Sequence, residues 1–411
     1  MQQKDDSIIR QIYDADSHIM ETRNWLHEYA DPDVRPLLGQ MNFRALPDPK
    51  VRPDYTPDFY EKGWGPERIK DAEENILERK QWAALGAVDR SERSRALDAL
   101  GFQRQFVFAT FSWGQFDPFA YAPTAKAGDP KALYGGARAH NRGVAEFCAD
   151  DSRLMASGMV PLDMPELAMG LVDELLEGGC RGVVIPTGIG RSDPTGKTWS
   201  HPDNDPVWAR LSEAGVPAVL HIGAGALTAL PTWIYENGKR PTYMLAGDNP
   251  DGWQIQDLYA NWWPAPLFLQ ALAIDGVFER FPGLKVAVCE YETGWVPHFL
   301  NRVDRVHATA ARVNPDDYEL PRMASEYIRE RVKFAPVPSS TSPGPAESWY
   351  WVMTSVVEGE RLLMFNSDYP HSEGGTDPVG VFDEELAKFG DRRDEVAELV
   401  FSQNFIEIFG E

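Results

Sequence analysis

The amino-acid sequence predicts an α/β protein, a distorted (β/α)8 barrel with long loop insertions. Short apolar, β-branched segments alternate with amphipathic helical segments along most of the chain, a pattern typical of parallel βαβ units. No linker rich in Pro, Ser or Gly separates two halves, as two doubly wound domains would require. We therefore expect one barrel domain over residues 1–411, with excursions at about 31–70 and 224–265.

The expected strands are short and apolar, and each is followed by a helical or polar segment. In chain order they are 11–21, 102–111, 153–162, 181–188, 216–223, 284–290, 331–337 and 362–371. The expected helices are 87–101, 136–151, 166–180, 205–215, 295–308 and the closing 394–410. The first excursion, rich in Pro, Asp and Arg, is expected to be a loop. The second, rich in Trp, Tyr and Pro, is typical of a lid or a subunit contact.

The charge balance argues against several classes of partner. The chain has 63 Asp and Glu against 40 Lys and Arg, which gives a formal net charge of −23. Such a chain repels phosphate backbones and anionic membrane surfaces, so we expect neither nucleic-acid nor membrane binding. The acidity itself does not identify a substrate, because a local site can oppose the overall field.

The cysteine content and the absence of targeting features predict a cytoplasmic protein. The three cysteines, Cys148, Cys180 and Cys289, are scattered and form no CxxC motif or disulfide framework. The first residues, MQQKDDSIIRQIYD, are too charged for the core of a signal peptide. No stretch approaches the roughly 18 apolar residues of a membrane span.

Metal-competent side chains follow several of the expected strands. In a barrel, the active site forms at the ends of the strands, and there the sequence places Asp16, His18, His221, Glu290, Asp368 and His371. Each has a structural alternative on its own: a hydrogen-bonded histidine, an aspartate that caps a helix, or a glutamate paired with an arginine. Their coincidence at equivalent strand ends favours a metal centre. Asp-x-His also places both side chains on one face of an extended segment.

Four segments carry a resemblance to a known family. DADSHIME (14–21), PAVLHIG (217–223), FPGLKVAVCEYETGWVPHFLNRVD (281–304) and SDYPHSEG (367–374) resemble, in this order, the amidohydrolase-related family. That family includes aminocarboxymuconate semialdehyde and γ-resorcylate decarboxylases, and the closing QNFIEIFG is similar to its last helix. The resemblance implies an amidohydrolase-type barrel with a divalent metal at its mouth. By motif, Asp16, His18, His221 and Asp368 occupy the positions of family ligands.

Two departures from the family pattern point to a second metal. The first motif is D-x-H instead of H-x-H, which makes the site more anionic. Glu290 stands where the decarboxylases carry an acid–base histidine, and His371 follows three residues after Asp368. A carboxylate can bridge two ions, and this mixture of nitrogen and oxygen ligands suits Fe, Mn or Zn. The sequence is also similar to the non-haem diiron oxygenases of this fold, a branch that motif spacing alone does not separate from binuclear hydrolases.

The leading hypothesis is therefore a non-haem diiron monooxygenase that hydroxylates an unactivated C–H bond of a small, apolar or acyl substrate. Asp16, His18 and His221 would hold one iron, with Glu290, Asp368 and His371 completing or bridging the second. It would use O2 and an external electron donor, because the chain shows neither a dinucleotide motif nor a cysteine cluster. Its expected catalytic residues are Asp368, Glu290 and His201, the last as a proton carrier unless it only makes a loop hydrogen bond.

Two alternatives belong to other classes. A metal-dependent hydrolase or decarboxylase would use a metal-bound hydroxide, with Asp368 as general base, on an amide, ester or carboxylate substrate. A non-catalytic or scaffolding subunit of a hetero-oligomer would be expected to have a degraded ligand set, whereas this set is intact. For the enzyme we expect a homo- or hetero-oligomer.

Further candidates have weaker support. The segment 188–198 resembles a phosphate-binding loop, but five residues instead of four separate its glycines. Arg35 and Arg191 could receive a substrate carboxylate, and Trp262, Trp263 and Trp295 could line an apolar pocket, although such aromatics more often belong to a core.

Overall fold

A computed structural model describes most of the chain. The described residues are 10–41, 56–61, 65–120, 124–126, 128–187, 197–224, 262–316, 320–338 and 348–411. The predicted phosphate-loop segment up to residue 196, with Arg191, and nearly all of the excursion at 224–265 lie outside them.

Seven parallel strands form one sheet in the order in which they occur in the chain. The strands are β1 (Tyr13–Ile19), β2 (Arg104–Ala109), β3 (Leu154–Met159), β4 (Gly182–Val184), β5 (Ala218–His221), β6 (Val286–Cys289) and β7 (Val332–Ala335). All seven lie within predicted strands and are almost entirely buried. A sheet in which each strand pairs with the next in sequence is the arrangement of a barrel wall. The predicted barrel fold is confirmed.

The eighth position of the wall is filled by residues 362–369. On one side, Phe334 of β7 donates its N–H to the Leu362 carbonyl at 2.8 Å. On the other side, His18 of β1 donates to the Tyr369 carbonyl at 2.7 Å. The segment makes only isolated bridges with its neighbours, so the expectation of a regular strand at 362–371 is wrong. One physical reason is visible at Asp368, where φ is +50° and the backbone leaves the extended region.

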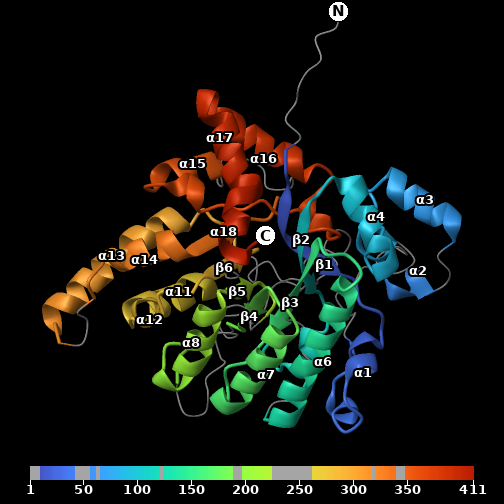
Figure 1. Cartoon of the computed structure of the whole chain (residues 1–411), viewed down its shortest axis with the longest axis horizontal. Coiled ribbons are helices and arrows are strands. Elements are labelled where there is room, and N and C mark those ends of the chain that lie inside the picture. Colours follow the sequence, from blue (N-terminus) through green and yellow to red (C-terminus); the bar gives the residue numbers. More distant parts are fainter. Residues whose placement is uncertain are drawn as a thin grey trace, which may run out of the picture.

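Helices surround this wall. Those before β4 are α1 (Trp25–Tyr29), α2 (Pro57–Glu61), α3 (Pro66–Glu74), α4 (Arg90–Leu100), α5 (Trp113–Phe116), α6 (Pro130–Cys148) and α7 (Pro165–Glu177). Those after it are α8 (Asp205–Ala214), α11 (Pro264–Ile274), α12 (Val277–Arg280), α13 (Val296–Val313), α14 (Ala324–Arg331), α15 (Trp349–Ser355), α16 (Pro378–Leu386), α17 (Arg393–Glu398) and α18 (Asn404–Phe409). Figure 1 shows α6, α7 and α8 side by side along one flank of the sheet.

Local sequence signals explain where the longer helices begin and end. Asp89 caps α4 by accepting the N–H of Ser91 at 2.9 Å, and the helix ends at Gly101, whose φ of +75° suits glycine. Asp129 caps α6 in the same way, directly before Pro130 at the first helical position. The predicted closing helix is real but interrupted, because residues 399–403 form a π-helical turn between α17 and α18.

The first excursion is more ordered than the sequence predicts. Its described residues include α2, the start of α3 and a short 3-10 turn at Arg35–Leu37, so the expectation of a plain loop at 31–70 is wrong in part. These helices are too short to produce a clear hydrophobic period, which explains why the pattern misses them.

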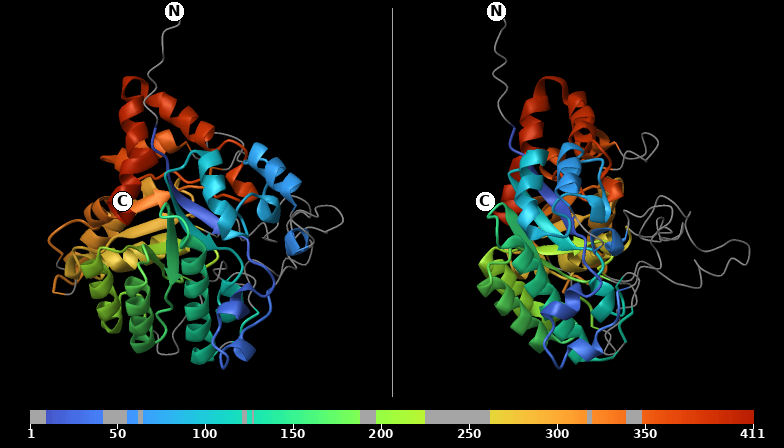
Figure 2. Two further views of the ribbon diagram at one scale, coloured as in Figure 1. Left: turned by 45° about the vertical axis from the view of Figure 1, so that its right-hand side comes forward. Right: turned by 90° about the vertical axis from the view of Figure 1, so that its right-hand side faces the viewer.

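The two ends of the described chain pack together. Arg10 pairs with Asp383 of α16 at 2.8 Å, and the Tyr13 ring meets Phe405 of α18 at 5.5 Å. The C-terminal helices therefore cover the start of β1, as both views in Figure 2 show. Within the described residues, no helix has the length and apolar character needed to cross a membrane.

An aromatic cluster holds residues 362–369, the segment that fills the eighth position of the wall. The buried ring of Phe365 lies 5.5 Å from Phe102 and 5.1 Å from both Phe382 and Phe401. We expect Phe365→Ala to lower the free energy of unfolding by about 3–5 kcal/mol, because it leaves a cavity beside the eighth wall position. Chemical denaturation measures this. Phe389→Ala, at a partly buried ring, is the control, and an equal loss in both variants would contradict the closing role.

Candidate metal centre

The structure brings all six predicted strand-end ligands together. They form two overlapping groups whose ligand atoms lie within 4.8 Å of one another and which could each hold a metal ion. The first group is Asp16, His18, His221 and Glu290, and the second is His18, Glu290, Asp368 and His371. His18 and Glu290 belong to both groups, so they occupy the centre of the cluster.

Short distances connect the members of the cluster. Asp16 Oδ1 lies 3.1 Å from His18 Nε2 and 3.4 Å from His221 Nε2. His221 Nε2 is also 3.4 Å from Glu290 Oε2. Asp368 Oδ1 lies 2.9 Å from His371 Nδ1 and 3.6 Å from His18 Nε2. Nitrogen and oxygen donors therefore face one another across a small space.

Several of the potential metal-ligand atoms in this cluster are buried without a hydrogen-bond partner. Among the described residues, they are Asp16 Oδ2, His18 Nε2 and both carboxylate oxygens of Asp368. Asp16 and Asp368 are fully buried, and Glu290 is only 8% exposed. Burial of unpaired carboxylates is unfavourable, and a divalent cation would satisfy them. The donor set fits a hard or borderline metal such as Mn, Fe or Zn.

The backbone is strained at two of the ligands. Glu290 has a φ of +63° and Asp368 a φ of +50°, in the left-handed region that non-glycine residues rarely adopt. Hydrogen bonds hold both conformations: Glu290 donates its N–H to the Ala335 carbonyl and Asp368 to the Asp16 carbonyl. Such strain is common at functional sites. The Glu290 and Asp368 carboxylates both point into the space between the ligands.

Burial and nearby charges shift the pKa values of the cluster residues in opposite directions. Burial and the nearby charge of Asp368 raise the pKa of Glu290 well above its usual value, and burial and Asp16 do the same for Asp368. Burial also acts to raise the pKa of Asp16, but the charge of His221 and its hydrogen bond to Asp16 outweigh burial and lower the pKa. Burial and the charge of His371 lower the pKa of His18. Opposed shifts of this kind are typical of a functional site.

Other side chains orient the cluster. His221 Nδ1 lies 2.7 Å from the Ile222 carbonyl, so this nitrogen carries the proton and Nε2 faces the carboxylates. Apolar rings pack against the same imidazole, with Phe108 at 4.2 Å and Trp113 at 5.4 Å between ring centres. These rings exclude water from one side of the centre.

Some predicted site residues do not join the cluster. His201 is more than a third exposed and accepts the N–H of Asp203 at 3.2 Å, at the start of a short 3-10 turn, Pro202–Asn204. Its observed contact is the loop hydrogen bond, and its catalytic role stays a prediction. Arg35 donates to the Ala30 carbonyl at 3.2 Å. Trp262 stacks on Trp295 with ring centres 6.2 Å apart.

Three residues beside the cluster were missed by sequence reasoning. Lys80 is 7% exposed, and its ammonium has no hydrogen-bond partner in the described structure. Glu21 and Thr110 contact the cluster or the loop that supports it. Glu21 and Thr110 both follow strand ends. A threonine is not among the usual metal ligands, so the ligand pattern does not mark Thr110, whereas Glu21 is a carboxylate that the same pattern could have included. No sequence signal marks Lys80.

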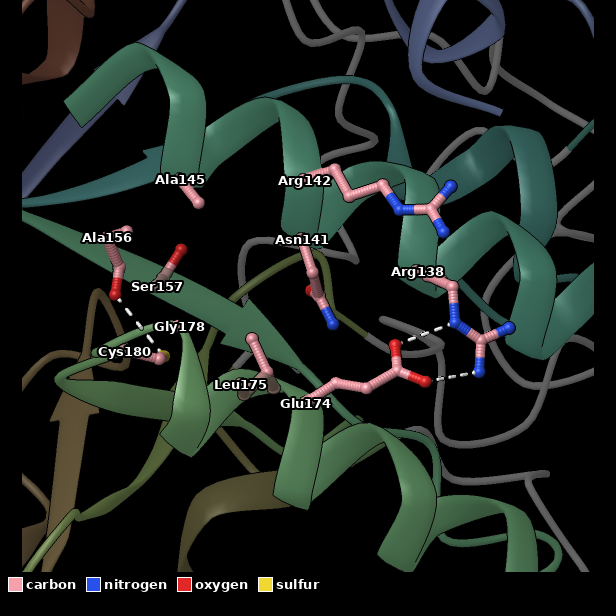
Figure 3. Close-up of a pocket in the computed structure, with 10 residues that line it drawn as sticks. All are labelled: Arg138, Asn141, Arg142, Ala145, Ala156, Ser157, Glu174, Leu175, Gly178 and Cys180. Atoms are coloured by element: carbon pink, nitrogen blue, oxygen red, sulfur yellow. Dashed lines mark hydrogen bonds and ion pairs between the residues drawn. The ribbon is translucent and has the colours of Figure 1, made fainter. Parts of the chain in front are cut away.

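A surface pocket lies apart from the metal-binding cluster, on the outer side of the wall. Its residues come from α6, β3, α7 and the turn after α7, and none of them belongs to the cluster. Figure 3 shows the ion pair across it, in which Arg138 Nε lies 2.7 Å from Glu174 Oε2. The pocket therefore gives no access to the predicted site residues.

Comparisons with known proteins agree with this architecture. An amidohydrolase from Mycobacterium avium subsp. paratuberculosis K-10 is 22% identical, with 98% of each chain covered and a TM-score of 0.70. A manganese-bound 5-carboxyvanillate decarboxylase from Novosphingobium aromaticivorans is 18% identical, with 98% and 96% covered and a TM-score of 0.61. A manganese-bound dihydroxybenzoic acid decarboxylase from Polaromonas sp. JS666 is 15% identical, with 97% of each covered and a TM-score of 0.58. No curated protein matched.

The fold and the buried cluster define a metal-binding barrel of the amidohydrolase type. The chain belongs to the amidohydrolase family, whose sequence profile matches residues 55–410. The predicted family is thereby confirmed. The structural similarities, all below 25% identity, support the fold alone, and none of these comparisons supports iron or an oxygenase.

Because Glu290 belongs to both ligand groups, we expect its carboxylate to contribute to metal affinity. Glu290→Gln removes a charge shared by both ligand groups, so we expect metal affinity to fall by at least about 10-fold. Calorimetric titration with Mn²⁺ measures it. Glu292→Gln, at an exposed glutamate two residues later, is the matched control. Equal metal affinity in the wild type and Glu290→Gln would contradict the assignment.

Proposed function

We propose that this protein is a metal-dependent lyase that decarboxylates a small organic acid. The observation that carries the proposal is a buried cluster of carboxylates and imidazoles together with a buried cation, Lys80, which has no hydrogen-bond partner and interacts electrostatically with Asp368. The decarboxylases described above share the barrel and contain manganese. This choice reverses the order of the sequence hypotheses, in which the oxygenase stood first.

In this proposal the ligand groups have separate roles. Asp16, His18, His221 and Glu290, the first ligand group, would hold a divalent ion, with Mn²⁺ favoured over Zn²⁺. The ion would act as a Lewis acid toward an oxygen of the substrate. Asp368 and His371, whose Oδ1 and Nδ1 atoms are 2.9 Å apart, form an acid–base pair able to move a proton.

Lys80 would bind the acidic group of the substrate. Its side chain is buried, and burial lowers the pKa of its ammonium to about 8, against the opposing effect of Asp368 and Glu373. At neutral pH it remains mostly protonated. A buried cation without a partner is unfavourable, and the carboxylate of a substrate would provide the missing hydrogen bonds.

The direct test of this function is turnover without oxygen. Protein loaded anaerobically with Mn²⁺ or Zn²⁺ is given 5-carboxyvanillate and a series of hydroxybenzoic acids, and CO2 release is measured. We expect CO2 from at least one acid, with no need for O2 or a reductant. Turnover that requires iron, O2 and a reductant would contradict the lyase proposal.

That contradicting outcome corresponds to the second candidate, the diiron monooxygenase. One observation favours it: the two ligand groups overlap at Glu290, a carboxylate able to bridge two ions. In that case Asp368 and His371 would hold a second ion instead of serving as an acid–base pair. Two irons per chain and substrate-dependent O2 uptake would support it.

Removal of the Lys80 charge separates substrate binding from metal binding. In Lys80→Met we expect the KM for the acidic substrate to rise about 10–100-fold, since a charge-assisted hydrogen bond is lost. Metal content should not change. Lys70→Met, at an exposed lysine, is the control. An unchanged KM in Lys80→Met, or a loss of its metal, would exclude Lys80 as the anion-binding residue.

A further inference from the structure

One hydroxyl group contacts two histidines of the cluster. Thr110 directly follows β2, and its Oγ1 lies 3.0 Å from His371 Nε2 and 3.4 Å from His18 Nδ1. The same hydroxyl donates to the Ile19 carbonyl at 2.9 Å. The two imidazoles stack on each other, with ring centres 3.9 Å apart. Thr110 therefore lies at the outer edge of both rings at once.

The hydrogen positions follow from the capacity of a hydroxyl. A hydroxyl has one proton to donate and two lone pairs that accept. The Ile19 carbonyl can only accept, so we assign the Thr110 proton to it, and in this arrangement the Thr110 oxygen accepts from both imidazoles. With that assignment His371 carries its proton on Nε2, and His18 carries its proton on Nδ1. The nitrogens left with free lone pairs are His371 Nδ1 and His18 Nε2.

Those two nitrogens are the ones that face the cluster. His371 Nδ1 lies 2.9 Å from Asp368 Oδ1, and His18 Nε2 lies 3.1 Å from Asp16 Oδ1. A neutral imidazole binds a metal through its unprotonated nitrogen. The opposite tautomer would turn an N–H of His18 toward the position of the ion, and an N–H of His371 toward Asp368, its partner in the acid–base pair.

A buried carboxylate fixes the position of Thr110. The Glu21 side chain accepts the backbone N–H groups of Thr110, Phe111 and Ser112 at 2.9–3.1 Å. Glu21 is fully buried and lies two residues after the end of β1, three residues after His18. The loop after β2 is thus tied to the strand that carries two of the ligands.

We propose that Thr110 is a positioning residue that sets the tautomer and ring orientation of both His18 and His371. This inference rests on the proposed metal centre, and it goes beyond it by assigning a role to a residue that binds no metal. A partner that orients a metal-binding histidine typically contributes 10–100-fold to metal affinity.

The test compares three variants of the full chain. Thr110→Val keeps the shape of the side chain and removes the hydroxyl, and Thr110→Ser restores the hydroxyl. Thr187→Val is the matched control, because Thr187 is also a buried threonine but bonds to the Tyr291 hydroxyl at 3.0 Å. Mn²⁺ affinity is measured by calorimetry. Nitrogen-15 NMR of the histidines in the Zn²⁺-loaded protein reports which nitrogen of each ring carries the proton.

The expected pattern is specific to the hydroxyl. Thr110→Val should bind Mn²⁺ about 10–100-fold more weakly and lose the protected N–H signals on His371 Nε2 and His18 Nδ1. Thr110→Ser should stay within a few-fold of the wild type, and Thr187→Val should not change. Wild-type affinity and wild-type imidazole signals in Thr110→Val would overturn the inference.

Failure of the proposed metal centre can be distinguished from failure of the role proposed for Thr110. A wild-type chain that binds neither Mn²⁺ nor Zn²⁺ contradicts the metal centre. The imidazole N–H signals of the metal-free wild type and Thr110→Val then still decide whether the hydroxyl sets the two tautomers.

Discussion

The burial of several carboxylates in one small space is the constraint on which the site depends. Asp16, Glu290 and Asp368 converge at the ends of separate wall positions, where little water reaches them. Desolvation and mutual repulsion raise the pKa of Glu290 and of Asp368. A chain without a compensating cation would have no reason to keep such an arrangement, because apolar residues would pack there at lower free energy.

The surrounding structure holds this unfavourable arrangement in place. Two ligands sit in strained, left-handed backbone conformations fixed by hydrogen bonds to neighbouring wall positions. The outer nitrogens of the histidines are engaged by the Ile222 carbonyl and the Thr110 hydroxyl. Aromatic packing behind Phe365 closes the wall at its irregular eighth position. Rigid support of this kind is what a metal-binding site requires of a protein scaffold.

The sequence predicts the barrel and the ligands because both depend on local patterns. Alternating strands and helices identify the wall, and strand-end positions select the six ligands that the structure brings together. The positions of Lys80, Glu21 and Thr110 depend on tertiary contacts, which have no periodic signature. The irregular segment at 362–369 and the π-helical turn at 399–403 depend on backbone geometry that composition does not encode. The identity of the metal and the reaction are harder to predict from the sequence, because the same nitrogen and oxygen ligands suit several metals.

Every role assigned to the residues of this site requires that the buried cluster bind a metal ion. An anomalous scattering map of crystals grown with Mn²⁺ tests it most directly. We predict a peak among Asp16, His18, His221 and Glu290, and a second peak beside Asp368 and His371 only if the centre is binuclear. A map with no peak at the cluster, or with manganese only elsewhere on the protein, would contradict the account.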